Sequence, residues 1–521
     1  MARLRLLDLA KLPRLTQAYH RFLRTPITAA QAVEIIRGRL ATREERFIQI
    51  AGRAIYEHPG SPYLQFLRAA GCEFGDLKAL VAKEGLEGAL SCLVEAGVYV
   101  TFDEFKGRKE AVRGGRRFVF SEKDFDNPHI SPDLEVRSGG TRSPGTPVRM
   151  QLAFIADLAA NTALALQAHG LSHYDHAVWL YSGVGLLLIY AKLGRPPLAW
   201  FYPVGPLPFR VRARARYVAV LSRLTSSPMP TPTFLDLQEP GRIAAWLATR
   251  LKEGKAVCVT TYASSAVRIC AAAKEMGLNL SGIWFITLGE PYTDAKKQTV
   301  EAVGARALVR YAFTEAGIIG YLCGEPHTSD DLHFHSDCYA LIQRSRTVGD
   351  SGPSVEAFLF TSLLPSAPKI LLNVESGDYG VMERRRCGCR LGAVGLTTHL
   401  ARIRSFEKLS GEGMTFVQTD LLRILEEVLP ARFGGTSADY QALEEEGDNG
   451  ILRLLLIVSP RVGLVDENKV RETFLEQLGR DARIGQAYAE IWRRAGTVHV
   501  KRQWPVPTRA GKILPFHLIK A

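Results

Sequence analysis

The sequence lacks the features that mark secreted, membrane-spanning and repetitive proteins. Its 521 residues include only 8 cysteines, without the regular spacing of a disulfide framework. Asp8 and Pro13 interrupt the start of the chain, so it has no uninterrupted apolar signal core. The most apolar run, residues 177–191, is shorter than the ~18 to 20 residues that cross a bilayer. We therefore expect a cytoplasmic globular protein with no membrane span.

Acidic residues are also fewer than basic ones. Against 66 Lys and Arg there are 53 Asp and Glu, which gives a formal net charge of +13. Such an excess attracts polyanions, but the distribution of the charge matters more than its size. Here it is spread over separate stretches, such as residues 209–217 and 384–386. This pattern favours a solvated basic surface over a docking patch for nucleic acid, an acidic carrier protein or a nucleotide.

The length and the residue pattern predict more than one compact unit in an α/β fold. Residues 1–130 have the apolar spacing of helices, and Thr28 with Gln31 forms a capping-box pattern. Residues 131–403 alternate helical segments with short apolar strands, which is typical of a buried α/β sheet. Residues 404–521 restart this pattern as a smaller α/β unit, in which we interpret the acidic segment 444–450 as a loop.

A loop rich in glycine and hydroxyl side chains precedes the helical segment that starts near residue 151. Such a loop exposes backbone N–H groups and hydroxyls that can hold phosphate. The GxxxxGK[ST] pattern is absent, which disfavours a P-loop NTPase. An ordinary surface turn explains the loop about as well. Its candidate phosphate ligands are Ser138, Gly139, Gly140, Thr141 and Gly145.

Three further motifs follow predicted strands, where α/β proteins bind ligands. Gly289, Glu290 and Pro291 come after one strand and are equally compatible with a routine turn. Tyr311, Thr314 and Glu315 offer, in order, an aromatic face for a purine, a hydroxyl for phosphate and a carboxylate for Mg²⁺. Asp378 can accept hydrogen bonds from both ribose hydroxyls. Near the end of the chain, Lys512 could meet charge that develops on a phosphate ester.

The order and spacing of these motifs resemble the adenylate-forming superfamily of acyl-CoA synthetases, peptide-synthetase adenylation domains and luciferases. Within it, the chain looks most like the phenylacetate–CoA ligase branch, over most of residues 60–521. The resemblance implies a large multi-subdomain α/β adenylation domain and a small, mobile α/β C-terminal domain. In it Lys512 drives adenylation with Thr314 and Glu315, and Arg404, in the segment between the domains, contacts ribose or phosphate.

Some positions depart from the family pattern. The phosphate loop carries an apparent insertion, Ser143-Pro144, and Val148 stands where its closing lysine is expected. Arg142 or Arg149 could replace that charge, although arginine and lysine are not equivalent. Phe406 occupies the usual hinge aspartate position and Glu407 follows it. The implied domain rotation is therefore expected to be tuned differently.

A structural zinc site is a further hypothesis. Cys387 and Cys389 lie after Asp378, where the branch often carries Cys-x-Cys, and Cys323 and His327 lie upstream. Four soft ligands in two short pairs suit tetrahedral Zn²⁺, but free core cysteines explain them equally well. His333 and His335 alternate with apolar residues, so we interpret both as ordinary strand residues.

The resemblance implies ATP, Mg²⁺ and a carboxylic acid as reactants, with acyl-AMP and pyrophosphate as products. The acyl group then passes to a thiol, with coenzyme A as the leading acceptor and an acyl carrier protein or an amine as the alternative. Aromatic segments at 200–202 and 260–262 would suit an aryl or medium acyl chain, although core packing explains them equally well. A catalytically idle relative that binds nucleotide or nucleic acid ranks lower, because Lys512 and Glu315 are retained.

Overall fold

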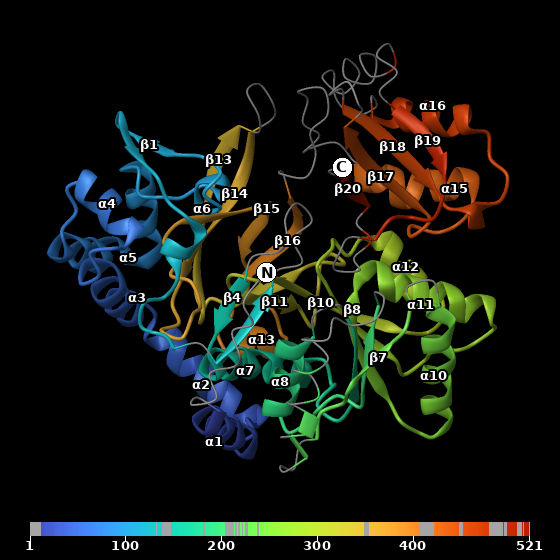
Figure 1. Cartoon of the computed structure of the whole chain (residues 1–521), viewed down its shortest axis with the longest axis horizontal. Coiled ribbons are helices and arrows are strands. Elements are labelled where there is room, and N and C mark those ends of the chain that lie inside the picture. Colours follow the sequence, from blue (N-terminus) through green and yellow to red (C-terminus); the bar gives the residue numbers. More distant parts are fainter. Residues whose placement is uncertain are drawn as a thin grey trace, which may run out of the picture.

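The structure is a computed structural model that describes residues 12–131, 133–137, 147–180, 183–203, 228–236, 239–347, 354–405, 421–446, 452–478, 498–507 and 515–519, with a few single residues between these ranges. N-terminal helices lie on one side, a large sheet occupies the centre, and a smaller C-terminal unit lies at one end (Figure 1). None of the described helices is long and apolar enough to span a membrane. The fold is α/β, as the sequence predicts.

The N-terminal region is mainly helical, and its capping box is confirmed. Thr28 Oγ1 accepts a hydrogen bond from the Gln31 backbone, and Gln31 Oε1 accepts one from the Thr28 backbone at 2.9 Å. The longest helix of the region bends at Gly85, whose φ of 70° suits a residue without Cβ. The helices are α1 (Leu12–Arg24), α2 (Ala29–Ala41), α3 (Arg43–Ala51), α4 (Pro62–Ala69), α5 (Phe74–Glu95) and α6 (Phe102–Phe105). Two small hairpins follow, β1 (Ala111–Arg113) with β2 (Arg116–Phe118) and β3 (Leu134–Arg137) with β4 (Pro147–Met150).

One half of the 12-stranded central sheet is parallel. Every residue of its strand Val257–Tyr262 is buried, which explains the continuous apolar run that the sequence shows there. The strands are β5 (Asp175–Trp179), β6 (Ala199–Tyr202), β7 (Pro232–Phe234), β8 (Val257–Tyr262), β9 (Trp284–Leu288) and β10 (Arg306–Phe313). The accompanying helices are α7 (Leu152–Ala168), α8 (Val184–Lys192), α10 (Pro240–Lys252), α11 (Ala263–Glu275) and α12 (Asp294–Glu301).

The other half of the sheet is antiparallel and begins where β10 turns back into the next strand. In the sheet, the strand order is β13-β14-β15-β16-β12-β11-β10-β9-β8-β5-β6-β7. Strand β10 is therefore the boundary between the halves, with a parallel neighbour on one side and an antiparallel neighbour on the other. The antiparallel strands are β11 (Gly317–Leu322), β12 (Leu332–Phe334), β13 (Tyr339–Thr347), β14 (Ser354–Ser362), β15 (Val374–Arg384) and β16 (Thr398–Ser405). The short helix α13 (Arg390–Ala393) lies between β15 and β16 in the chain.

The C-terminal unit has its own four-stranded sheet, in the order β19-β18-β17-β20. Its segment 444–450, expected to be a loop, begins inside the strand Tyr440–Glu446, so that expectation is wrong for its first three residues. The elements are α14 (Leu421–Arg423), a π-helical turn (Ile424–Val428), α15 (Leu429–Phe433), β17 (Tyr440–Glu446), β18 (Leu452–Val458), α16 (Glu467–Leu478), β19 (Val498–Arg502) and β20 (Phe516–Ile519).

Apolar packing separates the chain into two main cores. One core contains buried residues from Tyr19 to Leu400, so the N-terminal helices share it with the large sheet. The second contains residues from Leu421 to Val498 and belongs to the C-terminal unit. Because burial of apolar surface is the main favourable term in folding, each core can stabilise its own unit. The predicted boundary at residue 404 lies inside β16, which ends at Ser405.

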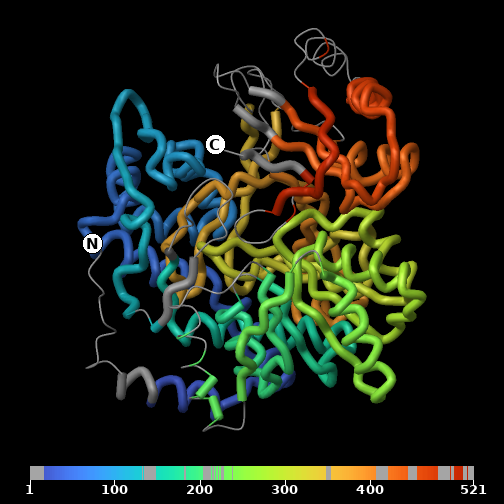
Figure 2. The backbone as a smooth tube through the Cα atoms, turned by 45° about the vertical axis from the view of Figure 1, so that its right-hand side comes forward, coloured from blue at the N-terminus to red at the C-terminus, as the bar shows by residue number. Residues whose placement is uncertain are grey.

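A buried ion pair joins the two units. Lys296 Nζ on α12 lies 2.7 Å from Glu426 Oε1 in the π-helical turn, and the side chains are 2% and 1% exposed. Thr293, the residue before α12, donates a hydrogen bond to the other carboxylate oxygen of Glu426. Figure 2 shows the C-terminal unit against the side of the molecule that carries α11 and α12. Removal of one partner from such a pair leaves a buried charge uncompensated, which is expensive.

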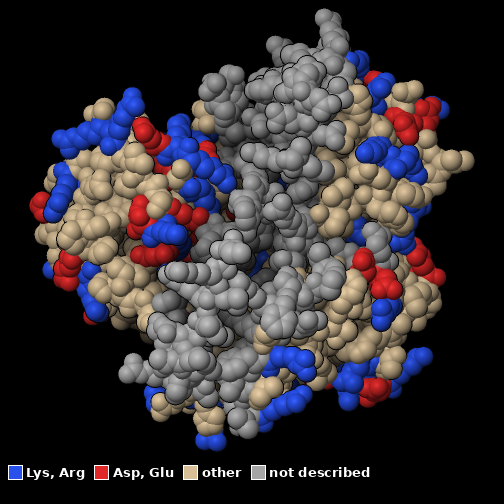
Figure 3. Space-filling model, viewed as in Figure 1, with Lys and Arg blue, Asp and Glu red and all other residues tan. Residues whose placement is uncertain are grey.

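Charged residues on the visible face do not gather into a single patch. Basic side chains lie on both the N-terminal and the C-terminal sides of this face, and acidic side chains lie among them (Figure 3). The described part of this face is therefore a mixed surface, as the sequence suggests.

The buried pair gives a stability prediction. We expect Glu426→Gln to lower the free energy of unfolding by about 3 kcal/mol, because the Lys296 ammonium then stays buried without its counter-charge. A Lys296→Met, Glu426→Leu double variant should recover most of this loss. Denaturant-induced unfolding measures both. The exposed pair Arg242–Glu239 is the control, and Glu239→Gln should change stability by less than about 0.5 kcal/mol. An equally small effect of Glu426→Gln would contradict the prediction.

Candidate functional site

Two residues predicted to contact adenosine meet directly. The Tyr311 hydroxyl, near the end of β10, donates a hydrogen bond to Asp378 Oδ2 on β15 at 2.7 Å. In the sheet order β11, β12 and β16 separate these two strands, so the antiparallel half must curl to bring them together. Aromatic rings fill the space beside them, with Phe313 and Phe360 centroids 5.2 Å apart. The pair thus presents a carboxylate beside an aromatic face.

The backbone of β15 directs the Asp378 side chain toward Tyr311. The ladder between β15 and β16 is irregular between Tyr379 and Val381. At Gly380 a Cβ would come within 2.8 Å of the Ala401 carbonyl oxygen, so only glycine fits this close approach. A bulge of this kind changes where neighbouring side chains point. Asp378 lies opposite Ser405 in the same ladder.

Proton positions in the pair follow from its surroundings. Burial, and then the adjacent Asp378 carboxylate, raise the pKa of Tyr311 well above that of a free phenol. Tyr311 therefore stays a neutral hydrogen-bond donor near neutral pH. A carboxylate such as that of Asp378 can accept hydrogen bonds from a vicinal diol.

The turn between β10 and β11 carries Thr314 and Glu315. Glu315 Oε1 accepts a hydrogen bond from Lys106 Nζ at 2.5 Å, and both side chains are largely buried. Just after the turn, Gly317 has a φ of 82°. A Cβ there would meet Leu158 and Phe154 of α7 at 2.9 and 3.1 Å, so α7 packs tightly against the hairpin. Because α7 follows the β3–β4 hairpin, this contact relates the flanks of the glycine-rich loop to the Glu315 turn.

The Gly289-Glu290-Pro291 segment forms hydrogen bonds with the start of α11 and with α12. Glu290 accepts hydrogen bonds from the Ser264 backbone at 2.9 Å and from its hydroxyl at 2.8 Å, at the start of α11. A carboxylate in this position satisfies free N–H groups and suits the helix dipole. The Pro291 carbonyl accepts a hydrogen bond from Lys296 at 2.8 Å. The segment is thus fixed between the sheet edge and the interface with the C-terminal unit.

Arg404 lies close to the same region on β16. It faces Tyr379 across the β15–β16 ladder, next to the position that pairs with Asp378. Its Nη1 is 3.4 Å from Asp330 Oδ2. The same Nη1 donates a hydrogen bond to the Ile403 carbonyl at 2.8 Å, so the long contact with Asp330 is the one that a phosphate or a ribose can replace.

Several predicted residues lie outside the described part of the chain. These are the loop residues Ser138, Gly139, Gly140, Thr141 and Gly145, the hinge residues Phe406 and Glu407, and Lys512. The loop's flanking strands are described, and Arg137 pairs with Pro147 at their ends. Val148 is fully buried on β4, whereas Arg149 is exposed.

The expected aromatic acyl-pocket segments are largely engaged in the core. Trp200 is 2% exposed and donates to the Leu180 carbonyl at 3.3 Å. Thr260 bonds to the Tyr190 hydroxyl at 2.6 Å, and Thr261 donates to the Trp179 carbonyl at 3.0 Å. These contacts show that core packing accounts for at least Trp200, Thr260 and Thr261 in the two segments.

Three cysteines converge away from the Tyr311–Asp378 pair. The sulfur of Cys323, just after β11, lies 3.8 Å from that of Cys387 and 3.9 Å from that of Cys389, and the latter two are 3.4 Å apart. Tetrahedral zinc with Zn–S bonds of about 2.3 Å separates its sulfurs by about 3.8 Å. The three thiols are therefore spaced like ligands of one ion.

The histidine beside these thiols is His333, so the prediction of His327 as the fourth ligand is wrong. His333 Nε2 lies 3.1 Å from the Cys389 sulfur and 3.4 Å from that of Cys387. His327 is exposed and lies outside the group of metal-ligating atoms found among the described residues. His333 does lie in a strand, β12, as expected, but its ring faces the thiols, whereas His335 is a buried core residue whose pKa burial lowers to about 4.

The neighbours of the cluster suit a metal. His333 Nδ1 donates to the Leu396 carbonyl at 2.6 Å, which leaves Nε2 free as a ligand. A hydrogen bond from Cys323, followed by bonds from His333 and two backbone N–H groups, lowers the pKa of Cys389. At Gly392 a Cβ would lie 2.7 Å from the Cys387 sulfur, so only glycine fits there.

A second histidine borders the cluster. His399 forms a group of candidate ligands with Cys323, His333 and Cys387, whose ligand atoms lie within 4.8 Å of one another, and its buried Nε2 has no hydrogen-bond partner within the described residues. Its Nδ1 bonds to Asp331 Oδ1 at 2.8 Å. Since structural zinc takes four ligands, the short distances favour the three thiols with His333.

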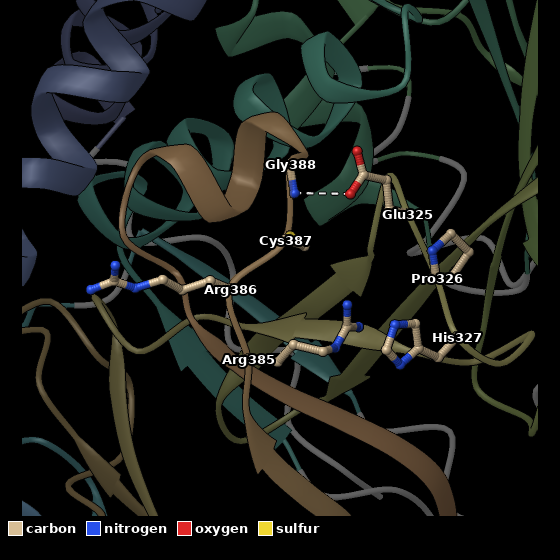
Figure 4. A pocket seen from close by; sticks show the side chains of 7 residues that line it. All are labelled: Glu325, Pro326, His327, Arg385, Arg386, Cys387 and Gly388. Atoms are coloured by element: carbon tan, nitrogen blue, oxygen red, sulfur yellow. Dashed lines mark hydrogen bonds between the residues drawn. The ribbon is translucent and has the colours of Figure 1, made fainter.

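An open pocket adjoins the cluster, and Figure 4 shows the side chains around it. Glu325 accepts a hydrogen bond from the Gly388 backbone at 2.8 Å and so joins the two cysteine-bearing loops. Arg385 lies beside His327 and is paired with Asp331. The lining residues are Glu325, Pro326, His327, Arg385, Arg386, Cys387 and Gly388.

Solved structures similar to this chain include two CoA ligases and an amide bond synthetase. A 2-hydroxyisobutyryl-CoA ligase in complex with 2-HIB-AMP and CoA is 16% identical, with a TM-score of 0.47 over 95% of this chain and 91% of that one. The amide bond synthetase McbA from Marinactinospora thermotolerans is 12% identical, with a TM-score of 0.44 over 96% of this chain and 98% of that one. The anthranilate CoA ligase AuaEII in complex with anthranoyl-AMP is 11% identical, with a TM-score of 0.44 over 73% of this chain and 65% of that one.

No protein-family model matches the chain, and no curated protein sequence matches it either. Identities of 11 to 16% with TM-scores below 0.5 assign no activity by themselves. The phenylacetate–CoA ligase branch stays a prediction. Any functional conclusion therefore depends on the residues of the site.

The thiol cluster gives a metal prediction. We expect purified protein to contain zinc near equimolar amounts, and Cys387→Ser and His333→Asn to lose it and to unfold at lower temperature, because metal binding contributes to folding free energy. Elemental analysis and thermal denaturation with and without a chelator measure this. His327→Asn is the matched control and should keep its zinc. Loss of zinc from His327→Asn, with retention in His333→Asn, would reverse the assignment.

Proposed function

We propose that the chain is an ATP-dependent ligase that activates a carboxylic acid as acyl-AMP and transfers the acyl group to an acceptor, with coenzyme A the leading choice. The observation that carries this proposal is the Tyr311–Asp378 hydrogen bond, formed where β10 ends in the Thr314–Glu315 turn. The Tyr311 ring offers an aromatic face, Asp378 a carboxylate for a diol, and Glu315, in the turn after β10, a carboxylate for a metal. That set is suited to a nucleoside triphosphate with its Mg²⁺.

Each residue has a separate task in the first half-reaction. Asp378 accepts hydrogen bonds from the ribose hydroxyls, and the Tyr311 ring lies along the adenine. Glu315, with Thr314, would hold Mg²⁺, which supplies neutralisation of phosphate charge when bound. The loop around Gly139 holds phosphate oxygens with backbone N–H groups, and Lys512 stabilises the charge that develops.

The chemistry is a displacement at phosphorus. A carboxylate oxygen of the acid bonds to the α-phosphorus of ATP, and the bond from that phosphorus to pyrophosphate breaks. The products are acyl-AMP and pyrophosphate. In the second half-reaction the acceptor thiolate bonds to the acyl carbon and AMP leaves with the bonding electrons. The protein contributes alignment and charge neutralisation, and no covalent enzyme intermediate is required.

Arg404 and the C-terminal unit belong to the second half-reaction in this proposal. Arg404 lies at the end of β16, the last described strand before the C-terminal unit. A rotation of that unit would withdraw Lys512 and open a path for the acceptor, and such domain motions typically take microseconds to milliseconds. Zinc at the three cysteines and His333 has a structural role here, as a link between loops.

Carboxylate-dependent ATP–pyrophosphate exchange over an acid panel tests the first step. We expect the wild-type chain to exchange with at least one aryl or medium-chain acid. Lys512→Ala should reduce exchange by about 100-fold or more while nucleotide binding changes little, since its charge acts mainly in the transition state. The control is Lys255→Ala, at an exposed lysine on a distant loop. Equal rates for Lys512→Ala and wild type would remove Lys512 from the mechanism.

The acceptor needs its own measurement. With the best acid from the panel, we expect coenzyme A to increase AMP release more than a holo acyl carrier protein or an amine does. A thioester product identified by mass spectrometry completes the assignment. If AMP release instead responds to the carrier protein or the amine, the alternative acceptor replaces coenzyme A and the adenylation step is unaffected.

A further inference from the structure

Lys106 is an unassigned cation beside the carboxylate that the proposed function gives to Mg²⁺. Its ammonium lies 2.5 Å from Glu315 Oε1 and 2.9 Å from Glu122 Oε1. The side chains are 12%, 13% and 18% exposed, respectively. One ammonium therefore sits between two carboxylates in a place with little access to water. The residue comes from the end of α6, far in sequence from every motif of the site.

One of the two carboxylates is firmly anchored. Glu122 begins a short 3-10 helix, and its carbonyl accepts a hydrogen bond from Lys369 at 2.6 Å. Lys369 is 2% exposed and pairs with Asp126 at 2.5 Å. This arrangement fixes the backbone of Glu122, whereas Glu315 lies on the turn between β10 and β11. Glu122 is thus the fixed partner of Lys106, and Glu315 the partner that a ligand can take away.

The lysine side chain is suited to a change of partner. Its ammonium also lies 5.7 Å from the ring centre of Phe102 and 5.5 Å from that of Phe105, which guide the chain by weak cation–π contacts. Lysine is a compact charge on a flexible stem, so it can move between acceptors without the fork geometry that arginine requires. A movement of a few ångströms needs no change in the backbone.

Charge balance determines which partner Lys106 takes when the site fills. A divalent cation on Glu315 and the Lys106 ammonium compete for the same carboxylate, and like charges repel at short distance. After the metal takes Glu315, the ammonium needs an anion on that side. The anion that arrives with the metal is the triphosphate.

We infer that Lys106 is a nucleotide-contacting residue: it pairs with Glu315 before binding and turns to the phosphate oxygens of Mg·ATP afterwards, while Glu122 keeps it in place. The inference rests on the proposed function. It concerns the β- and γ-phosphates, because these oxygens share the metal that Glu315 would hold. Binding of adenosine and of the α-phosphate does not require Lys106.

Direct binding separates this role from a structural one. We expect Lys106→Met to weaken binding of Mg·ATP and of magnesium pyrophosphate by about 10- to 100-fold, the range for one lost charge-assisted hydrogen bond. Binding of AMP should change less than about threefold. Lys106→Arg should restore part of the Mg·ATP affinity. Isothermal titration calorimetry measures all three ligands on the full chain.

A neighbouring ion pair provides the matched control. Arg113 pairs with Glu104 at 2.8 Å in the same region and with similar burial, and its other hydrogen bonds within the described residues are to the carbonyls of Gly97, Val112 and Tyr99. If Arg113→Met changes binding at all, it should do so equally for Mg·ATP and AMP. Equal weakening of Mg·ATP and AMP by Lys106→Met, or no weakening of either, would overturn the inference.

A second variant keeps the test decisive if Lys106→Met folds poorly. Glu122→Gln removes the fixed partner and leaves Lys106 in the chain, so Mg·ATP binding should weaken less than in Lys106→Met and AMP binding should not change. Weakening of AMP as much as Mg·ATP would count against the role. If the wild-type chain binds neither Mg·ATP nor AMP, the proposed function fails instead, and that outcome is distinct from any effect of Lys106.

Discussion

The arrangement of the site depends on strand β10, which pairs in parallel with β9 and antiparallel with β11. A parallel sheet delivers the ends of its strands to one edge, while an antiparallel hairpin returns the chain at once. The end of β10 therefore lies at the edge where the parallel strands end and also begins a tight antiparallel turn. The edge that collects ligands in α/β proteins thus acquires a tight turn with Thr314 and Glu315. The curl of the antiparallel half then brings Asp378 back to Tyr311.

The two units are connected through the same edge. Glu426 in the C-terminal unit pairs with Lys296, and Lys296 also donates to the Pro291 carbonyl in the segment after β9. A displacement of the C-terminal unit would therefore expose a buried ammonium that is attached to the Gly289–Pro291 turn. Because an unpaired buried charge is costly, the pair favours the docked arrangement until another interaction compensates for it. This couples the position of the C-terminal unit to the Gly289–Pro291 turn.

Local patterns predicted the parts of the fold that local forces determine. The Thr28 capping box, the α/β alternation and the buried strand β8 follow from hydrogen bonding and burial along a short stretch of chain. The apolar run at residues 369–375 is different, because β15 begins only at Val374 after Asn373, whose φ is 50°. Ile370, Leu371 and Leu372 are buried in the core before the strand begins, and an apolar pattern alone does not distinguish such residues from a strand.

Site residues that depend on register or on distant pairing escaped sequence reasoning. His333 faces the thiols because it lies opposite Tyr321 and His399 in the ladders of β12. A shift by one residue would turn it to the other face of the sheet. His327 seemed the better ligand only because it is closer to Cys323 in sequence. Lys106 carries no motif, and its meeting with Glu315 over 209 positions is a property of the tertiary fold.

The distance between Glu315 and the cysteine cluster separates the roles that we propose for them. Glu315 precedes β11 and Cys323 follows it, so six residues of extended strand, roughly 20 Å, lie between the carboxylate and the thiols. An ion at the thiols would therefore lie too far from Glu315 to act in the proposed reaction. Its effect would be to fix the end of β11 to the chain after β15 and to His333 on β12. Those strands belong to the antiparallel half that must curl for Asp378 to reach Tyr311, so a structural ion there would stabilise the curvature on which the Tyr311–Asp378 contact depends.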